Sequence, residues 1–151
     1  MPDLTILMSE TAAALADIQQ KQLPQLNQCN DWQSKYRILM QLGKHLPAFD
    51  SELQRDEFLI AGCESKLWLL HEYQPATQRH YWAFDSEARI IKGLVVLALC
   101  QINGLTQAEL ATVQFSQLFA LPGIQQNLSP SRQNGLQAVL KKLCQQAGLA
   151  K

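Results

Sequence analysis

The chain has 151 residues, a size that favours one domain able to bury its own hydrophobic core. Thirteen Lys and Arg residues balance thirteen Asp and Glu residues, so no bulk positive field favours nucleic acid or an anionic membrane as the partner. The longest apolar run, 94–100, is well short of the roughly 17 residues that cross a bilayer. The N-terminus has no basic segment ahead of an apolar one and does not resemble a secretory signal, so we expect a cytoplasmic protein.

The sequence contains no repeat and no linker, so we expect a single domain over 1–151, with residues 1–27 as an N-terminal helical extension. The alanine-rich stretch 11–20 predicts a helix within that extension. Apolar residues at three- and four-residue steps then predict a second helix, with Asp31 as its N-cap and Pro47 closing the segment.

The middle of the chain predicts a small antiparallel sheet. Residues 66–73 are rich in bulky side chains, and in a strand successive residues would point to opposite faces. Residues 79–84 are again dominated by aromatic side chains. A break at 75–78 separates the two runs, which predicts a hairpin. We expect 58–60 to add a third, shorter strand, and helices to cover the sheet, since so small a sheet is marginal in water.

Helices are predicted again after the sheet. Asp85 and Ser86 are expected to cap a central helix whose apolar face stops at Gly104. Thr106, with a glutamate three residues later, forms a capping box that opens a short helix. Ser129, followed by a proline, opens the last helix before Gly148. The order of helices, sheet and helices predicts an α+β fold.

The four cysteines, Cys29, Cys63, Cys100 and Cys144, lie 34, 37 and 44 residues apart, unlike a disulfide scaffold or the close pairs of zinc and dithiol sites. We expect Cys100 and Cys144 to pack inside helices and Cys29, which precedes a helix cap, to be exposed. No metal site is expected, because the histidines have no metal-ligand spacing; they are His45, His71 and His80.

Cys63 stands in the segment Gly62-Cys63-Glu64-Ser65, which is expected to be a turn between apolar runs. A glycine before the cysteine leaves room for another molecule to approach the sulfur. The alternative is that Cys63 is a small buried hydrophobe, and local sequence leaves both interpretations open. Asp85 and Glu87 flank Ser86, where capping of a helix is a simpler interpretation than a catalytic acid pair.

Four sequence blocks resemble the SufE/CsdE sulfur acceptors of cysteine desulfurases, in the same order and over about residues 28–146. Glu64 makes the chain look closer to the CsdE branch, whereas Gln33 and Phe58 depart from residues common in the family. The blocks are Trp32-Gln33-Ser34-Lys35-Tyr36 with Leu42-Gly43, Gly62-Cys63-Glu64-Ser65 with Trp68-Leu69, Asp85-Ser86 with Ile90-Ile91-Lys92-Gly93-Leu94, and Leu128-Ser129-Pro130-Ser131-Arg132-Gln133-Asn134-Gly135-Leu136.

The resemblance implies a persulfide carrier without independent turnover, which takes sulfur from a pyridoxal-phosphate cysteine desulfurase onto Cys63 and raises the turnover of that enzyme. It implies a three-stranded antiparallel sheet packed by helices, similar to IscU-type scaffolds, and no tightly bound cofactor in this chain. It also implies a downstream acceptor protein, in Fe-S assembly or another sulfur-using pathway. The other implied site residues are the loop residues Gly62, Glu64 and Ser65, and the docking residues Asp85, Ser86, Glu87 and Arg132.

Such a transfer needs a thiolate, which an ordinary cysteine with a pKa near 8.5 supplies only to a few per cent at neutral pH. Glu64 would oppose the anion, so we expect stabilisation from the partner and from Arg132, with Lys66 and Lys92 as weaker candidates. An Fe-S scaffold of similar fold and a non-catalytic adaptor remain the alternatives, and the sequence leaves open whether the free protein forms a homodimer.

Overall fold

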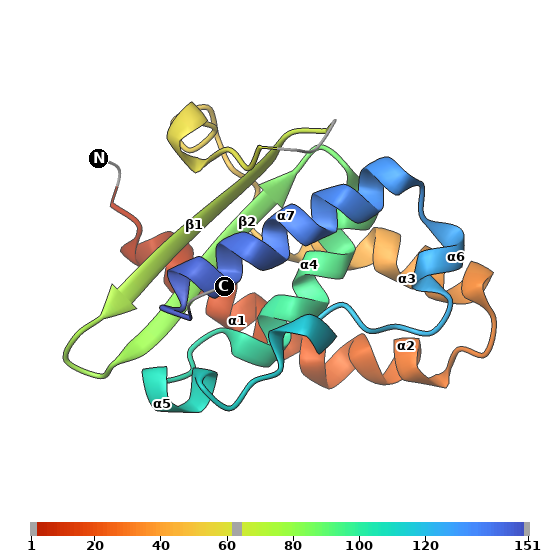
Figure 1. The fold of residues 1–151 in the computed structure, drawn as a ribbon, viewed down its shortest axis with the longest axis horizontal. Coiled ribbons are helices and arrows are strands. Elements are labelled where there is room, and N and C mark those ends of the chain that lie inside the picture. Colours follow the sequence, from red (N-terminus) through yellow and green to blue (C-terminus); the bar gives the residue numbers. More distant parts are fainter. Residues whose placement is uncertain (1–2, 62–64, 150–151) are drawn as a thin grey trace.

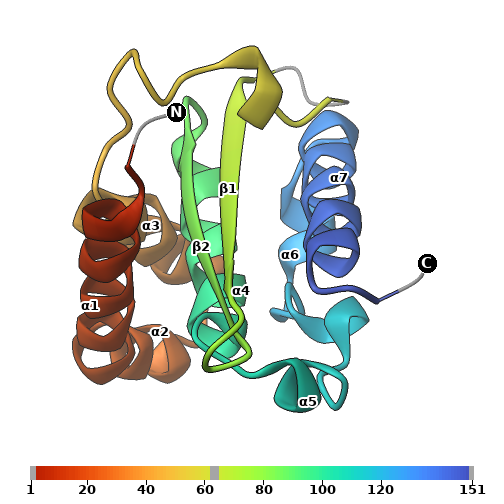
Figure 2. The ribbon, with the colours of Figure 1, turned by 90° about the vertical axis from the view of Figure 1, so that its left-hand side faces the viewer.

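A computed structural model describes residues 3–61 and 65–149. Helices surround a single β-hairpin in an α+β arrangement, with α1 and α7 on opposite sides of the hairpin (Figures 1 and 2). The helices are α1 (Thr5–Lys21), α2 (Leu23–Gln28), α3 (Trp32–Leu42), α4 (Arg89–Ile102), α5 (Gln107–Leu110), α6 (Ile124–Asn127) and α7 (Pro130–Gln146). Short 3-10 turns lie at Gly43–His45, Asp56–Phe58 and Phe115–Gln117. None of the helices within the described residues combines the length and the apolar character that crossing a bilayer requires.

The hairpin consists of β1 (Leu67–Gln74) and β2 (Arg79–Ser86), paired antiparallel from Leu67↔Ser86 to Gln74↔Arg79. Successive side chains of a strand point to opposite faces, and both faces are covered here. One face of the hairpin joins the main core with α4 and α7. The other face joins a smaller core with the start of α1 and the segment between α3 and β1.

The predicted third strand at 58–60 is wrong, because the described residues form only two strands. Residues Asp56–Phe58 form a 3-10 turn, and a single bridge, Leu59↔Trp68, pairs this segment with β1. The amide N–H groups of Phe58 and Leu59 donate to the carbonyls of Arg55 and Asp56, each at 3.1 Å. Since the turn uses these donors internally, the segment cannot extend its pairing along β1.

The predicted caps of the central helix are also wrong. β2 continues through Asp85 and Ser86, and α4 starts only at Arg89, with Ala88 as a N-cap that makes no side-chain capping bond. The Ser86 hydroxyl instead accepts the N–H of Ala88 at 3.0 Å. Strand pairing therefore continues two residues beyond the predicted end, and the helix begins later than predicted.

The other predicted helices are confirmed. The Asp31 carboxylate accepts the N–H of Ser34, and Thr106 and Glu109 form the capping box of α5. Ser129 accepts the N–H of Arg132 at the start of α7, with Pro130 in the first helical turn. The helix predicted at 11–20 starts earlier, at Thr5.

The central helix α4 supports the whole arrangement. It packs against α3 so closely that a Cβ atom on Gly93 would lie 2.0 Å from the carbonyl oxygen of Leu39. Only glycine allows this approach of two helix backbones. After α4 the chain turns at Gly104, whose φ of +81° lies in the left-handed region.

Candidate functional site

The loop predicted to carry sulfur joins the 59–60 segment to β1. The N–H of Ile60 donates to the carbonyl of Leu67 at 2.9 Å, and Leu59 pairs with Trp68 as an isolated bridge. These two contacts, which we call the loop stem, bring the chain before and after residues 61–66 together. Cys63 and its predicted neighbours Gly62 and Glu64 lie outside the described residues, so their predicted roles stay predictions.

Glu87 extends the stem toward β2. Its N–H donates to the carbonyl of Lys66 at 3.1 Å, and its carboxylate accepts the N–H of Lys66 at 3.3 Å. Glu87 and Lys66 are exposed, and Ser65 is half-buried. The structure therefore places two predicted site residues, Ser65 and Glu87, at the end of the hairpin where the loop begins.

Asp85 lies next to this stem but is largely withdrawn from solvent. Its carboxylate forms an ion pair with Lys92 at 2.9 Å, with side-chain exposures of 13% and 12%. It also accepts the N–H groups of Phe49 and Ser86, both at 2.8 Å. Asp85 thus links β2, α4 and the segment after α3, a role that the sequence analysis missed. Because Lys92 is already paired with this carboxylate, Lys92 is a weaker candidate to stabilise a thiolate.

Arg132 occupies the first turn of α7, where its N–H donates to the hydroxyl of Ser129 at 3.3 Å. Both views place the start of α7 at the same end of the hairpin as the loop stem (Figures 1 and 2). The predicted residues Ser65, Asp85, Ser86, Glu87 and Arg132 therefore gather at one end of the molecule.

Comparison with known proteins identifies the family of the chain. The family model described as "SufE: Fe-S metabolism associated domain" matches residues 20–147. The chain belongs to the SufE family. The matched range includes the loop stem, Asp85, Glu87 and Arg132, and excludes most of α1.

Individual relatives of this SufE-family chain cover most of its length. It is 41% identical over 108 residues to the sulfur acceptor protein CsdE of Escherichia coli, covering 72% of this chain and 73% of that protein. An uncharacterized SufE-like protein of Haemophilus influenzae is 39% identical over 127 residues, covering 81% of this chain and 98% of the relative. Another, from Rhizobium etli, is 32% identical over 120 residues, covering 78% and 81% of the two chains.

The three described cysteines are poor nucleophiles or are partly covered. Burial raises the pKa of Cys100 to about 11, and its Sγ lies 3.7 Å from the carbonyl of Leu15. Cys144 is buried in the main core, as predicted. Cys29, predicted to be exposed, is half-buried, and its Sγ donates to the carbonyl of Gln25 at 3.3 Å. None of these sulfur atoms belongs to the loop stem.

The structure also brings together two histidines, His71 and His80, whose spacing in the sequence indicates no common site. His71 Nε2 and His80 Nδ1 lie 2.8 Å apart at the other half of the hairpin, toward its turn. Their positions share one face because the strand register makes them diagonal neighbours, a relation visible in the sequence only once that register is assigned. No group of three His, Cys, Asp or Glu side chains suited to a metal ion occurs among the residues that the structure describes.

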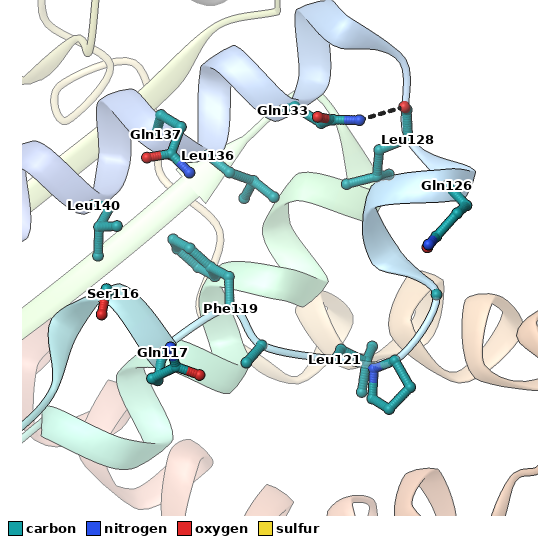
Figure 3. Close-up of a pocket in the computed structure, with 13 residues that line it drawn as sticks. Ser116, Gln117, Phe119, Leu121, Gln126, Leu128, Gln133, Leu136, Gln137 and Leu140 are labelled. Atoms are coloured by element: carbon teal, nitrogen blue, oxygen red, sulfur yellow. Dashed lines mark hydrogen bonds between the residues drawn. The ribbon is translucent and has the colours of Figure 1, made fainter.

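A cavity of about 530 Å³ lies between α7 and the segment 116–128 (Figure 3). Its described side chains are apolar or uncharged polar groups, among them Phe119, Leu136 and Leu140. Gln133 lies at its edge and donates from Nε2 to the carbonyl of Leu128 at 3.0 Å. No charged side chain is among the described residues that line the cavity, so the cavity adds no ionised group to the site.

Proposed function

We propose that this SufE-family chain accepts persulfide sulfur on Cys63 from a pyridoxal-phosphate cysteine desulfurase, stimulates that enzyme and hands the sulfur to a downstream protein. The observation that carries the proposal is the 41% identity to a protein named as a sulfur acceptor, within a family match that spans residues 20–147. Cys63 is the one cysteine in the segment 61–66, whose two ends the loop stem brings together.

The proposed step is a thiol exchange that needs no external oxidant or reductant. The Cys63 thiolate attacks the outer sulfur of the donor persulfide, a new S–S bond forms, and the donor cysteine leaves as a thiolate. The product on Cys63 is itself a persulfide, so one cysteine is enough. The same exchange in the other direction passes the outer sulfur to the next acceptor.

The surroundings of the stem support a division of labour between the two proteins. Glu87 adds negative charge at the surface beside the stem, and Lys92 is paired with Asp85. Nearby negative charge disfavours a thiolate. We therefore expect Arg132 and positive groups of the desulfurase to stabilise the Cys63 anion during transfer, and the exposed residues Lys66 and Glu87 to form part of the docking surface.

The test is mass spectrometry after incubation with a cysteine desulfurase and cysteine. We expect one added sulfur on the peptide that contains Cys63, and stimulated desulfurase turnover. Cys63→Ser should abolish both, whereas Cys29→Ser, a matched change of a half-buried thiol, should preserve both. Stimulation that survives Cys63→Ser would favour an adaptor, and a stable iron-sulfur absorption after anaerobic reconstitution would favour a scaffold; either result would overturn the proposal.

A further inference from the structure

The two edges of the hairpin differ in how their main-chain groups are used. At the outer edge of β2, the N–H of His80 donates to the carbonyl of Leu105 at 2.9 Å, and the carbonyl of His80 accepts the N–H of Gly104 at 2.7 Å. The N–H of Trp82 donates to Asn103 Oδ1 at 2.7 Å. The segment that follows α4 therefore closes the edge of β2.

The hydrogen bonds at the start of β1 show which of its residues face away from β2. The carbonyl of Lys66 accepts the N–H of Glu87, whereas the carbonyl of Leu67 accepts the N–H of Ile60 on the other side of the strand. The main-chain bonds of an antiparallel strand alternate between its two sides from one residue to the next. The odd-numbered residues of 67–73 therefore direct their N–H and C=O groups to the outer edge of β1.

The outer edge of β1 is uncovered over its second half. The loop stem covers only the start of this edge, with its bridge at Trp68. The main-chain N–H and C=O groups of His71 and Tyr73, which we call the open edge, have no hydrogen-bond partner among residues 3–61 and 65–149. In Figure 2 no helix or strand crosses in front of this half of β1. Such a row of unpaired groups is a template for pairing with another strand.

The strand that carries the open edge lacks the features by which monomeric proteins discourage strand pairing. β1 contains no lysine and no proline, and its register with β2 runs without a bulge from Leu67↔Ser86 to Gln74↔Arg79. Its end is also accessible, because Tyr73 keeps 40% of its surface in solvent. A strand with these properties is suited to extend the sheet into a second molecule.

Side-chain contacts behind the open edge hold it in place. His71 Nε2 lies 2.8 Å from His80 Nδ1, and His80 Nε2 lies 2.6 Å from Gln107 Oε1. Gln107 Nε2 donates to the carbonyl of Ala147 at 2.8 Å, so these contacts connect β1 to α5 and to the residue that follows α7. An edge that is already formed loses little conformational freedom when a partner binds to it.

We propose that the open edge pairs with the same edge of a second copy of this chain, antiparallel and around a two-fold axis at Tyr73. In this register the N–H and C=O of Tyr73 bond to those of the second copy's Tyr73, and the N–H of His71 faces the carbonyl of the second copy's Pro75. The two hairpins then form one continuous sheet. The dimer forms at the end of the hairpin opposite the loop stem, so it does not depend on the proposed sulfur transfer and leaves the stem of each copy free.

Side chains on both faces of the joined sheet fit this register. On one face the exposed rings of the two Tyr73 residues meet across the axis, and cross-strand aromatic pairs stabilise sheets. On the other face Glu72 of each copy lies opposite Gln74 of the other copy. Gln74 Oε1 accepts the hydroxyl of Thr77 at 3.3 Å, which leaves Gln74 Nε2 to donate to the carboxylate of the second copy's Glu72. Each carboxylate therefore faces a hydrogen-bond donor.

The neighbouring registers are less favourable. Pairing centred on Glu72 places two carboxylates directly opposite each other, which destabilises a sheet. Pairing centred on His71 brings the second copy's Tyr73 beside the start of β1, where the Leu59 segment already lies. The register centred on Tyr73 avoids both conflicts.

Sedimentation velocity of the full chain tests the dimer. An interface built on one strand pair is small and therefore weak, so the wild type should shift from monomer toward dimer as its concentration rises to about 1 mM. Gln74→Glu places carboxylates opposite each other on both sides of the axis and should weaken dimerisation about tenfold or more. Adding Glu72→Gln restores the carboxylate–amide pairs with the partners exchanged, so the double variant should dimerise to within about threefold of the wild type.

Gln20→Glu is the matched control, because it adds the same charge at an exposed position of α1. It should dimerise as the wild type does. A wild type that stays monomeric up to about 1 mM would overturn the proposal. So would a Gln74→Glu variant that dimerises as strongly as the wild type.

Amide hydrogen exchange of the wild type tests the same pairing without any variant. The N–H groups of His71 and Tyr73 should exchange more slowly as the protein concentration rises, whereas the N–H of Glu72, which faces β2, should not change. If neither of the two groups slows in concentrated protein, the proposal is wrong. Slowing that appears only after a cysteine desulfurase is added would also overturn it, and would assign the open edge to that enzyme.

Discussion

The two ends of the hairpin bury polar groups in opposite ways. At the loop end, Asp85 and Lys92 form an ion pair that also holds two backbone N–H groups. At the turn end, His71, His80 and Gln107 form a chain in which every hydrogen bond is made when both imidazoles are neutral. The loop end therefore depends on keeping two charges together, whereas the turn end depends on keeping charges out. Changes of charge and of pH should separate the two ends experimentally.

The largest effect should come from Gly93→Ala, which acts on the helix that supports both ends. The new Cβ would lie 2.0 Å from the carbonyl of Leu39, so α3 and α4 must move apart. We expect a loss of about 3 kcal/mol or more in the free energy of unfolding, measured with urea. Helix propensity alone would stabilise the protein by about 1 kcal/mol, so the sign of the change distinguishes the two effects.

Asp85→Ala should act at the loop end alone. It leaves Lys92 without its partner and two backbone N–H groups without their acceptor, so we expect a cost of about 3 kcal/mol in urea unfolding. Lys92→Met should cost less, because Asp85 keeps the N–H groups of Phe49 and Ser86. Equal costs for the two variants would mean that the ion pair, rather than the backbone bonds, accounts for the stability.

The turn end should make the free energy of unfolding depend on pH. The folded state lowers the pKa of His71 to about 4, so between pH 6.5 and pH 4 the unfolded chain binds more protons than the folded one. The contribution is complete above pH 6.5 and is lost as the pH falls toward 4. Because the ring is partly exposed, we expect a loss of about 1–2 kcal/mol.

Urea unfolding at pH 7.5 and pH 4.5 measures this loss, taken as the difference between the wild type and His71→Gln. The carboxylates titrate in both proteins and so cancel in the comparison. Asp85→Ala measured over the same range should retain the histidine contribution in full. A pH profile that is flattened by Asp85→Ala instead would show that the two ends are not independent.

The sequence predicted the features that depend on near neighbours in the chain. The caps at Asp31, Thr106 and Ser129 each bond to an N–H three residues later, so a short window contains the whole interaction. The third strand was wrong because its donors close a 3-10 turn. The cap predicted at Asp85 was wrong because its carboxylate finds Lys92 and Phe49 instead, and Phe49 is 36 residues away.

The same distinction applies to the site. The motif around Cys63 is contiguous in the sequence, and the role of Cys63 stays a prediction; the described part is the stem beside it, where Leu59 and Ile60 meet the start of β1. The histidine pair depends on the hairpin register, and Gln107 and Ala147 lie 27 and 67 residues beyond His80. Such contacts are set by packing of the whole chain, so the spacing of the histidines alone could not indicate them.

The smallest predicted effect should refine the comparison at the turn end. Thr106→Ala removes the hydroxyl that accepts the N–H of Glu109 at 3.2 Å, at a cost of about 1 kcal/mol. Ser129→Ala removes the corresponding cap of α7 beside Arg132, at a similar cost. Because α5 carries Gln107, Thr106→Ala should also speed hydrogen exchange at Ala147, whereas Ser129→Ala should speed exchange at the start of α7. Equal exchange at both places in the two variants would mean that α7 responds as one rigid unit, and that its two ends cannot be perturbed separately.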